Sequence, residues 1–273
     1  MHPVLFHIGS FALPTYGVLL ATALIAAVIT VTRLGRREGL DTSRLLDFST
    51  WIIVVALVGA KVLMILTDWD FYWRNPGQIF TWATLGAAGV FYGGFLAATL
   101  FAIWYIRLFK LPLWKVFDVY APAIALGQSI GRLGCFAAGC DYGRPTNSFL
   151  GVVFSNANLG GAPLGVHLHP TQVYESLATL TIFSILVWRY PHKSRDGEIF
   201  LLYLTLYAVA RFFLEFLRGD EDRGFVFNHL FSTSQFIAIL ALVTAGLLAL
   251  SFWGRRPAAM SHAAAALPDA KGR

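Results

Sequence analysis

Seven stretches of mostly apolar residues follow one another along the chain and constrain its fold more than any other feature. They cover roughly residues 16–34, 48–67, 88–108, 116–136, 173–190, 198–217 and 232–253. A helix needs about 20 such residues to cross a bilayer. Only 13% of the residues are charged, against about 25% in soluble domains. The sequence therefore predicts an all-α polytopic membrane protein with about seven transmembrane helices.

The basic residues predict how these helices are oriented. They cluster after the first, third, fifth and seventh stretches, at Arg33, Arg36, Arg37, Arg44; Arg107, Lys110, Lys115; Arg189, Lys193, Arg195; and Arg255, Arg256, Lys271, Arg273. Loops rich in Lys and Arg stay in the cytoplasm. We therefore expect the N-terminus outside and the C-terminus inside. The net charge of +6 is explained by this topology and does not indicate nucleic-acid binding.

The segments outside the apolar stretches are short. Residues 1–253 are expected to form a single transmembrane domain, with a small extracytoplasmic (periplasmic) head at 144–172 that contains one possible strand, "FLGVVF". Residues 254–273 are expected to be a disordered cytoplasmic tail. The N-terminus lacks the basic region and cleavage site of a removable signal peptide. Three tryptophans after the second stretch are typical of an interfacial aromatic belt: Trp69, Trp73 and Trp82.

Polar side chains from several stretches are expected at one depth, near the outer leaflet. They are Tyr16, Lys61, Tyr92, Arg132, Glu175, Arg211, Glu215 and Arg218. A charge in the hydrocarbon costs at least about 2.5 kcal/mol and usually marks function. Arginine stays charged and its forked donors match phosphate. The convergence predicts a polar cavity that binds an anionic lipid headgroup.

Each of these residues also has a structural interpretation. Arg211 and Glu215 lie four residues apart and could form a buried ion pair, on a stripe with Tyr203, Tyr207 and Arg218. Lys61 could extend to the interface, and Glu175 is expected to partner a neighbouring arginine. Tyr16 and Tyr92 could be aromatic anchors. For Arg132 the structural interpretation is weaker, because the residue lies between glycines, where a ligand can approach the backbone closely.

Several motifs together resemble the phosphatidylglycerol–prolipoprotein diacylglyceryl transferase family. They are "GRLGCFAAGCDYGRP", "HPTQVYES", "ARFFLEFLRGD", "PTYG" and "FYGGFLAA", and the resemblance covers about residues 5–253. It implies an enzyme of the bacterial cytoplasmic (inner) membrane, with its active cavity at the outer-leaflet level. Such an enzyme moves a diacylglyceryl group from phosphatidylglycerol to the lipobox cysteine thiol of a prolipoprotein, forming a thioether and glycerol phosphate.

The resemblance also implies roles for individual residues. It assigns catalysis to Tyr16, Tyr92, Arg132 and Arg211, and phosphatidylglycerol binding to Arg132, Gly143, Tyr207, Arg211 and Glu215. The implied partners are phosphatidylglycerol, the prolipoprotein signal peptide and membrane lipids, with no metal, cofactor or nucleic acid, and the protein is expected to be a monomer.

The chain departs from the family pattern at four positions. Tyr92 stands where the family usually has a histidine proposed as the base, and Cys135, Ala138 and Cys140 replace Asn, Asn and Glu. The chain could be a divergent member with an altered base, or a paralogue acting on another lipid or acceptor. A non-catalytic phospholipid binder or a transporter is a further alternative. Transport is disfavoured because the inner half has few polar residues beyond Asp118 and Gln128.

The two cysteines leave three interpretations open. On a continuous helix, residues five apart have Cα atoms about 8 Å apart, beyond the ~7 Å limit for a disulfide. A bridge therefore requires the helix to end before Cys140, and Gly139 is a suitable stop. Close packing by small residues is favoured over a disulfide, and a disulfide over catalysis. Two cysteines with distant histidines fall short of a zinc ligand set.

Overall fold

The computed structural model describes residues 3–8, 11–81, 84, 89–155, 161–220, 224–226 and 230–254. Within these residues, one long helix lies in each of the seven predicted stretches. They are α1 (Thr15–Arg37), α2 (Thr42–Thr67), α5 (Phe91–Leu108), α6 (Leu113–Ala138), α7 (Thr171–Arg189), α8 (Glu198–Leu214) and α9 (Thr233–Gly254). The predicted tail lies almost wholly outside the described residues.

Capping explains why α2 begins six residues before the predicted stretch. The Asp41 carboxylate accepts hydrogen bonds from the backbone N–H groups of Ser43 (2.9 Å) and Arg44 (3.4 Å). An N-cap of this kind satisfies donors that the first turn leaves unpaired. Hydropathy does not register such a turn because its residues are polar.

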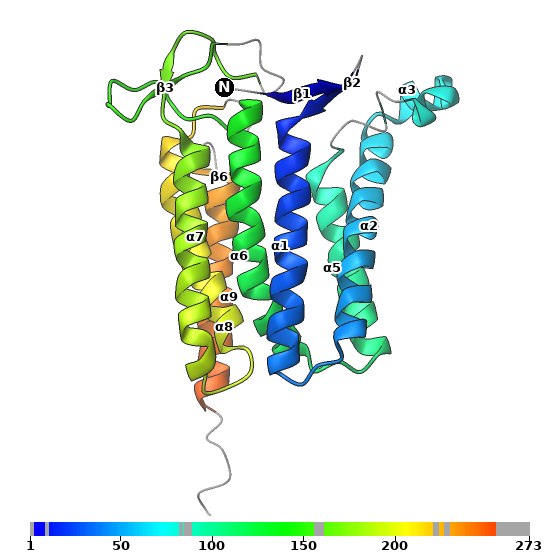
Figure 1. The fold of residues 1–273 in the computed structure, drawn as a ribbon, viewed down its shortest axis with the longest axis vertical. Helices are drawn as coiled ribbons and strands as arrows, with labels where there is room; N and C mark the ends of the chain where they lie inside the picture. The colour runs from blue at the N-terminus through cyan, green and yellow to red at the C-terminus, as the bar shows by residue number, and fades with distance from the viewer. Residues whose placement is uncertain are drawn as a thin grey trace, which may run out of the picture.

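The helices stand side by side (Figure 1). α6 is central: it packs against α1, α7 and α8, while α9 packs on α8 and α5 packs on α2. Near its N-terminal end α6 also contacts α2 and α5, since Tyr120 OH lies 2.7 Å from Ser49 Oγ and Val116 shares a buried cluster with Phe48 and Tyr105. A buried cluster joins α1, α2, α6, α7 and α8 through residues that include Val31, Leu45, Val119, Leu186 and Ile199.

Glycines bring α2 and α5 into close contact. A Cβ placed on Gly59 would lie 2.6 Å from the carbonyl oxygen of Gly93, and one on Gly93 would lie 2.4 Å from the carbonyl oxygen of Gly59. Small residues allow such approaches between membrane helices. The Gly-Gly pair of "FYGGFLAA" therefore has a packing role.

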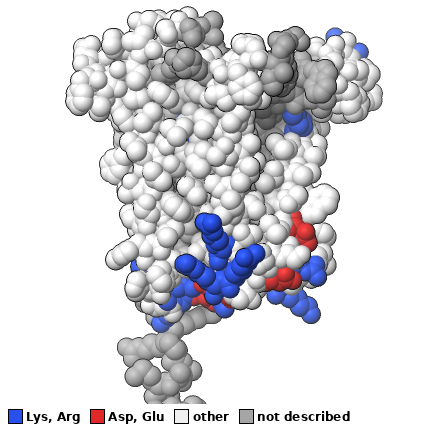
Figure 2. All heavy atoms as spheres, viewed as in Figure 1, with Lys and Arg blue, Asp and Glu red and all other residues white. Residues whose placement is uncertain are grey.

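Within the described part of the chain, four helical segments are long and apolar enough to cross a membrane: Thr15–Arg37, Thr42–Thr67, Glu198–Leu217 and Thr233–Ser251. The apolar helix Tyr92–Leu108 is shorter. On the face drawn in Figure 2, most Lys and Arg side chains gather at the lower end, and the middle is nearly free of charge. This banded surface is typical of a membrane protein.

Short hairpins lie at the upper end of Figure 1, which we call the hairpin end. In the described residues β1 (Val4–Ile8) pairs with β2 (Phe11–Pro14), β3 (Val152–Val153) with β4 (His167–Leu168), and β5 (Phe225–Val226) with β6 (Phe231–Ser232). The fold is therefore mostly helical but not all-α. The predicted strand in "FLGVVF" is confirmed for two residues; the other strands were not expected.

The head and the aromatic segment also lie at the hairpin end. Phe154, Ala162 and Leu168 form a small buried cluster on which Phe136 of α6 packs, which fixes the head to the end of that helix. The short helix α3 (Trp69–Arg74) stacks Trp69 on Trp73 with ring centroids 5.3 Å apart, and both rings are exposed. Trp82 lies outside the described residues. The 3₁₀ turn η1 (Pro76–Phe80) follows α3.

The loops after α1, α5 and α7 lie at the other end, which we call the basic end. There Asp118 of α6 is completely buried and accepts hydrogen bonds from the backbone N–H of Gly197 (2.9 Å) and Phe200 (3.0 Å) and from Lys193 Nζ (3.1 Å). These bonds fix the loop between η2 (Tyr190–His192) and α8. Asp118 thus has a structural role.

Candidate active site

Arg132 lies near the end of α6 and binds two carboxylates. Its Nη1 lies 2.6 Å from Asp141 Oδ2 and its Nε lies 3.1 Å from Glu175 Oε1 on α7. The Arg132 side chain is 22% exposed and that of Glu175 is 7% exposed. The expectation that Glu175 partners an arginine is confirmed. Among the described residues, Arg132 Nη2 forms no hydrogen bond.

The turn after α6 brings Asp141 back to Arg132. The helix ends at Ala138, and Gly139 adopts a left-handed conformation with φ of 75°, which confirms the predicted stop. Asp141 is also left-handed, with φ of 56°. Gln172 Nε2 donates to the carbonyl of Cys140 (2.6 Å) and Thr171 Oγ1 to that of Asp141 (2.8 Å). Residues of "HPTQVYES" therefore hold this turn in place.

Arg218 differs from its predicted position on the helical stripe with Arg211 and Glu215. α8 ends at Leu214, the next three residues form the 3₁₀ turn η3 (Glu215–Leu217), and Arg218 is extended. The tighter turn directs Arg218 toward α6, where its Nη2 lies 2.6 Å from Asp141 Oδ1. Its guanidinium also pairs with Asp220. Asp141 therefore bridges Arg132 and Arg218.

Arg211 and Glu215 form the predicted ion pair, with Arg211 Nη2 2.9 Å from Glu215 Oε2. The same Nη2 donates to Ser234 Oγ of α9 at 2.9 Å. Arg211 Nη1 is buried and has no hydrogen-bond partner among the described residues. A buried donor of a charged group without an acceptor is costly, so a ligand oxygen is expected at this position.

Tyr207 links the two arginine clusters. It lies one turn before Arg211 on α8, stacks on Tyr203 with ring centroids 5.7 Å apart, and lies near Glu175, the partner of Arg132. It also interacts electrostatically with both Arg132 and Arg211. The structure therefore brings together four residues predicted for the site, namely Arg132, Tyr207, Arg211 and Glu215.

Gly143 has a packing role in the same region. Its N–H donates to the carbonyl of His169 (3.1 Å), and a Cβ at this position would lie only 2.4 Å from that oxygen. A side chain here would displace the segment that leads into α7. The glycine is thus required for the close approach of two backbone segments.

The two tyrosines predicted for catalysis have different surroundings. Tyr16 on α1 lies against α6, since a Cβ on Gly134 would be 3.1 Å from its ring, and Arg132 is among its electrostatic neighbours. Tyr92 lies in the first turn of α5, is 53% exposed, and belongs to the helix that packs on α2. Lys61 of α2 donates to the carbonyl of Thr84.

Asp141 is the electrostatic centre of the network. Burial alone would raise the pKa of its carboxyl, but the guanidiniums of Arg218 and Arg132 outweigh this effect and lower the pKa below its usual value. Sequence reasoning did not select Asp141, although it lies inside the quoted glycine-arginine motif. It also did not select Ser234.

Cys135, Cys140 and Asp141 place two thiol sulfurs and a carboxylate oxygen within 4.8 Å of one another. This set could in principle hold a metal ion. However, the Asp141 carboxylate is already paired with two guanidiniums. Their positive charge disfavours a cation at this position.

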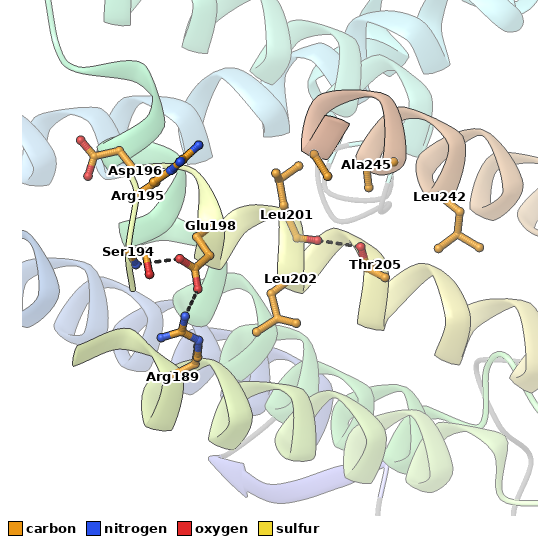
Figure 3. A pocket seen from close by; sticks show the side chains of 12 residues that line it. Arg189, Ser194, Arg195, Asp196, Glu198, Leu201, Leu202, Thr205, Leu242 and Ala245 are labelled. Atoms are coloured by element: carbon orange, nitrogen blue, oxygen red, sulfur yellow. Dashed lines mark hydrogen bonds and ion pairs between the residues drawn. The ribbon is translucent and has the colours of Figure 1, made fainter. Parts of the chain in front are cut away.

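A cavity of about 450 Å³ lies at the basic end, between α8, α9 and the loop before α8 (Figure 3). Its walls are apolar, with Leu201, Leu202 and Leu242, and at its mouth Arg189 pairs with Glu198. It lies at the end opposite Arg132. The cavity therefore does not belong to the arginine network.

Comparison with known proteins agrees with the resemblance. The family model described as prolipoprotein diacylglyceryl transferase matches residues 3–251. A phosphatidylglycerol–prolipoprotein diacylglyceryl transferase of Clostridium tetani is 34% identical over 243 residues, which are 89% of this chain and 94% of that protein. A homologue of the same name from Listeria innocua is 31% identical over 246 residues, 89% of this chain and 87% of that protein. The chain belongs to the prolipoprotein diacylglyceryl transferase family.

Proposed function

We propose that this chain transfers the diacylglyceryl group of phosphatidylglycerol to the cysteine thiol of a prolipoprotein, with Arg132 and Arg211 binding the phosphate. The observation that supports these roles is the pair of guanidinium nitrogens that form no hydrogen bond within the described residues, Arg132 Nη2 and the buried Arg211 Nη1. Arg132 Nη1 and Nε and Arg211 Nη2 each pair with a carboxylate. Both side chains are thus oriented while donors remain for an anion.

The reaction is a substitution at a glycerol carbon. The cysteine sulfur forms a bond to this carbon, the bond from the carbon to the phosphate oxygen breaks, and glycerol phosphate leaves with the bonding electrons. Arginines beside the leaving oxygen would stabilise the developing charge. The thiol proton must pass to a base, a role for which we retain Tyr92. Tyr207 lies near both arginines and Glu175 and would contact the phosphate that they bind.

The membrane arrangement proposed with this function has seven crossing helices, with the hairpin end outside and the basic end in the cytoplasm of a bacterial inner membrane. The positive-inside rule supports it, since the loops after α1, α5 and α7 carry the basic clusters. Phosphatidylglycerol of the outer leaflet and the exported prolipoprotein would then reach Arg132 from the same side. We propose that a monomer suffices because one chain supplies the whole network.

The phosphate role can be tested with purified protein, labelled phosphatidylglycerol and a lipobox peptide. Arg211→Ala should weaken phosphatidylglycerol binding and abolish most thioether formation, because it removes the donor Nη1. Arg189→Ala is a matched control, since Arg189 also pairs with a glutamate but lies at the basic end. Equal losses in both variants would contradict the role of Arg211. Binding without any thioether would favour a non-catalytic lipid binder.

A further inference from the structure

The turn that ends α6 folds Cys140 back over Cys135. Because Gly139 is left-handed, the N–H of Cys140 bonds to the carbonyl of Cys135 at 3.2 Å. The Cys140 thiol points the same way, since its Sγ donates to that carbonyl at 3.6 Å. The helical geometry that would keep the two residues apart has therefore ended before Cys140.

The two sulfurs are already close to each other. They lie within 4.8 Å, both are free thiols, and both are partly buried. A disulfide needs the sulfurs to approach to about 2 Å, which side-chain rotation can supply once the helical constraint is absent. Thiols are weak hydrogen-bond donors and acceptors, so little is lost when they are oxidised.

A bridge between Cys135 and Cys140 would also affect the position of Asp141. It follows Cys140 directly, and its carboxylate holds both Arg132 and Arg218 at 2.6 Å. A covalent link between Cys135 and Cys140 would restrict the turn that carries this carboxylate. It would also fix Asp141 relative to Arg132, which lies on the same helix as Cys135.

We propose that Cys135 and Cys140 are oxidised to a disulfide that fixes Asp141 against Arg132. Both thiols lose a proton and the sulfurs join, while the two electrons reduce the disulfide of a thiol–disulfide oxidoreductase to two thiols. The proposal rests on the outward orientation given under the proposed function, because oxidising conditions are found on that side of the membrane. Close packing alone, the interpretation favoured from the sequence, would leave both thiols free.

Counting thiols tests the proposal directly, since the chain has only two cysteines. Protein is extracted from the native membrane in denaturant with N-ethylmaleimide, with or without prior reduction, and the intact mass is measured. We expect no maleimide adduct before reduction and two adducts after it. Two adducts without reduction, or a bound metal or lipid in place of the bridge, would overturn the proposal.

The positioning effect is tested by melting the folded protein in detergent. Reductant should lower the melting temperature of the wild type and leave that of Cys140→Ser unchanged. Cys135→Ser is the matched second variant and should behave like Cys140→Ser. An oxidised wild type whose melting temperature does not respond to reductant would overturn the claim that the bridge fixes the turn.

Transfer activity separates this proposal from the proposed function. Cys135→Ala combined with Cys140→Ala should retain a substantial part of the activity, because neither sulfur takes part in the substitution. An active wild type with free thiols would contradict only the disulfide proposal. An oxidised wild type that forms no thioether would contradict only the proposed function. An inactive but folded double variant would overturn the positioning role and make the thiols part of the reaction.

Discussion

Replacement of Arg132 by lysine keeps the charge but removes the geometry on which the proposed phosphate site depends. The guanidinium uses Nη1 for Asp141 and Nε for Glu175, and Nη2 remains for a ligand. An ammonium group presents its three donors from one nitrogen and lacks the fixed fork by which a guanidinium can reach two carboxylates and a phosphate oxygen from separate atoms. We therefore expect Arg132→Lys to fold and insert but to lose most of its activity.

The size of the loss follows from the number of contacts given up. Removing one donor that stabilises developing charge typically lowers the rate about 100- to 1000-fold. A fall in kcat/KM of about 100-fold corresponds to about 2.7 kcal/mol, since each tenfold change is 1.36 kcal/mol. Arg132→Ala should be at least as inactive, and less stable, because Glu175 would then be buried without its cation.

The assay is thioether formation on a lipobox peptide, with the melting temperature as the measure of folding. Arg189→Lys at the basic end is the control, because Arg189 has similar exposure and also pairs with a glutamate. Near-normal turnover by Arg132→Lys, in a folded protein, would refute the claim that the forked geometry of Arg132 is needed.

Three further predictions concern the rest of the network. Asp141→Asn should lower transfer about tenfold by loosening Arg132 and Arg218, an effect of the size of one charge-assisted hydrogen bond. These arginines outweigh burial and lower the pKa of Asp141 in the folded protein. The ionised carboxylate therefore stabilises the fold fully above the unfolded-state pKa of about 3.9. This stabilisation is lost as the pH falls through the lower pKa of the folded state. The difference in melting temperature between wild type and Asp141→Asn should therefore vanish on acidification, and a difference that persists at the acid limit would be inconsistent with this. Glu215→Gln should weaken transfer less than Arg211→Ala, since Arg211 keeps its bond to Ser234. A larger loss of transfer in Glu215→Gln than in Arg211→Ala would contradict the assignment of Arg211 as the phosphate-binding residue and Glu215 as its partner. Tyr92→Phe should lower activity and alter the pH–rate profile, whereas an unchanged profile would leave Tyr92 with packing alone.

Much of the helical framework could be predicted because each helix carries its own apolar stretch. Local spacing also sufficed for the Arg211–Glu215 pair, and the glycine rule sufficed for the end of α6 at Gly139. In each case the information lies within a few residues of the chain. Tertiary contacts did not need to be known.

The centre of the network could not be predicted because it depends on where the chain goes after a helix ends. Helical periodicity extended α8 through Arg218, but the structure changes to a 3₁₀ turn at Glu215 and directs Arg218 to Asp141. Asp141 itself returns to α6 because residues of α7, including Gln172, bind the turn. Neither event has a periodic signal in the sequence.

The proposed reaction forms a thioether from phosphatidylglycerol at a site built around Arg132 and Arg211. The most direct measurement uses purified protein, phosphatidylglycerol labelled in both the acyl chains and the headgroup, and a lipobox peptide. We expect the peptide to gain one diacylglyceryl group on its cysteine for each glycerol phosphate released, and Arg132→Lys to lose both products together. Headgroup release without peptide modification, or a peptide modified equally well by Arg132→Lys, would contradict the proposed reaction at this site.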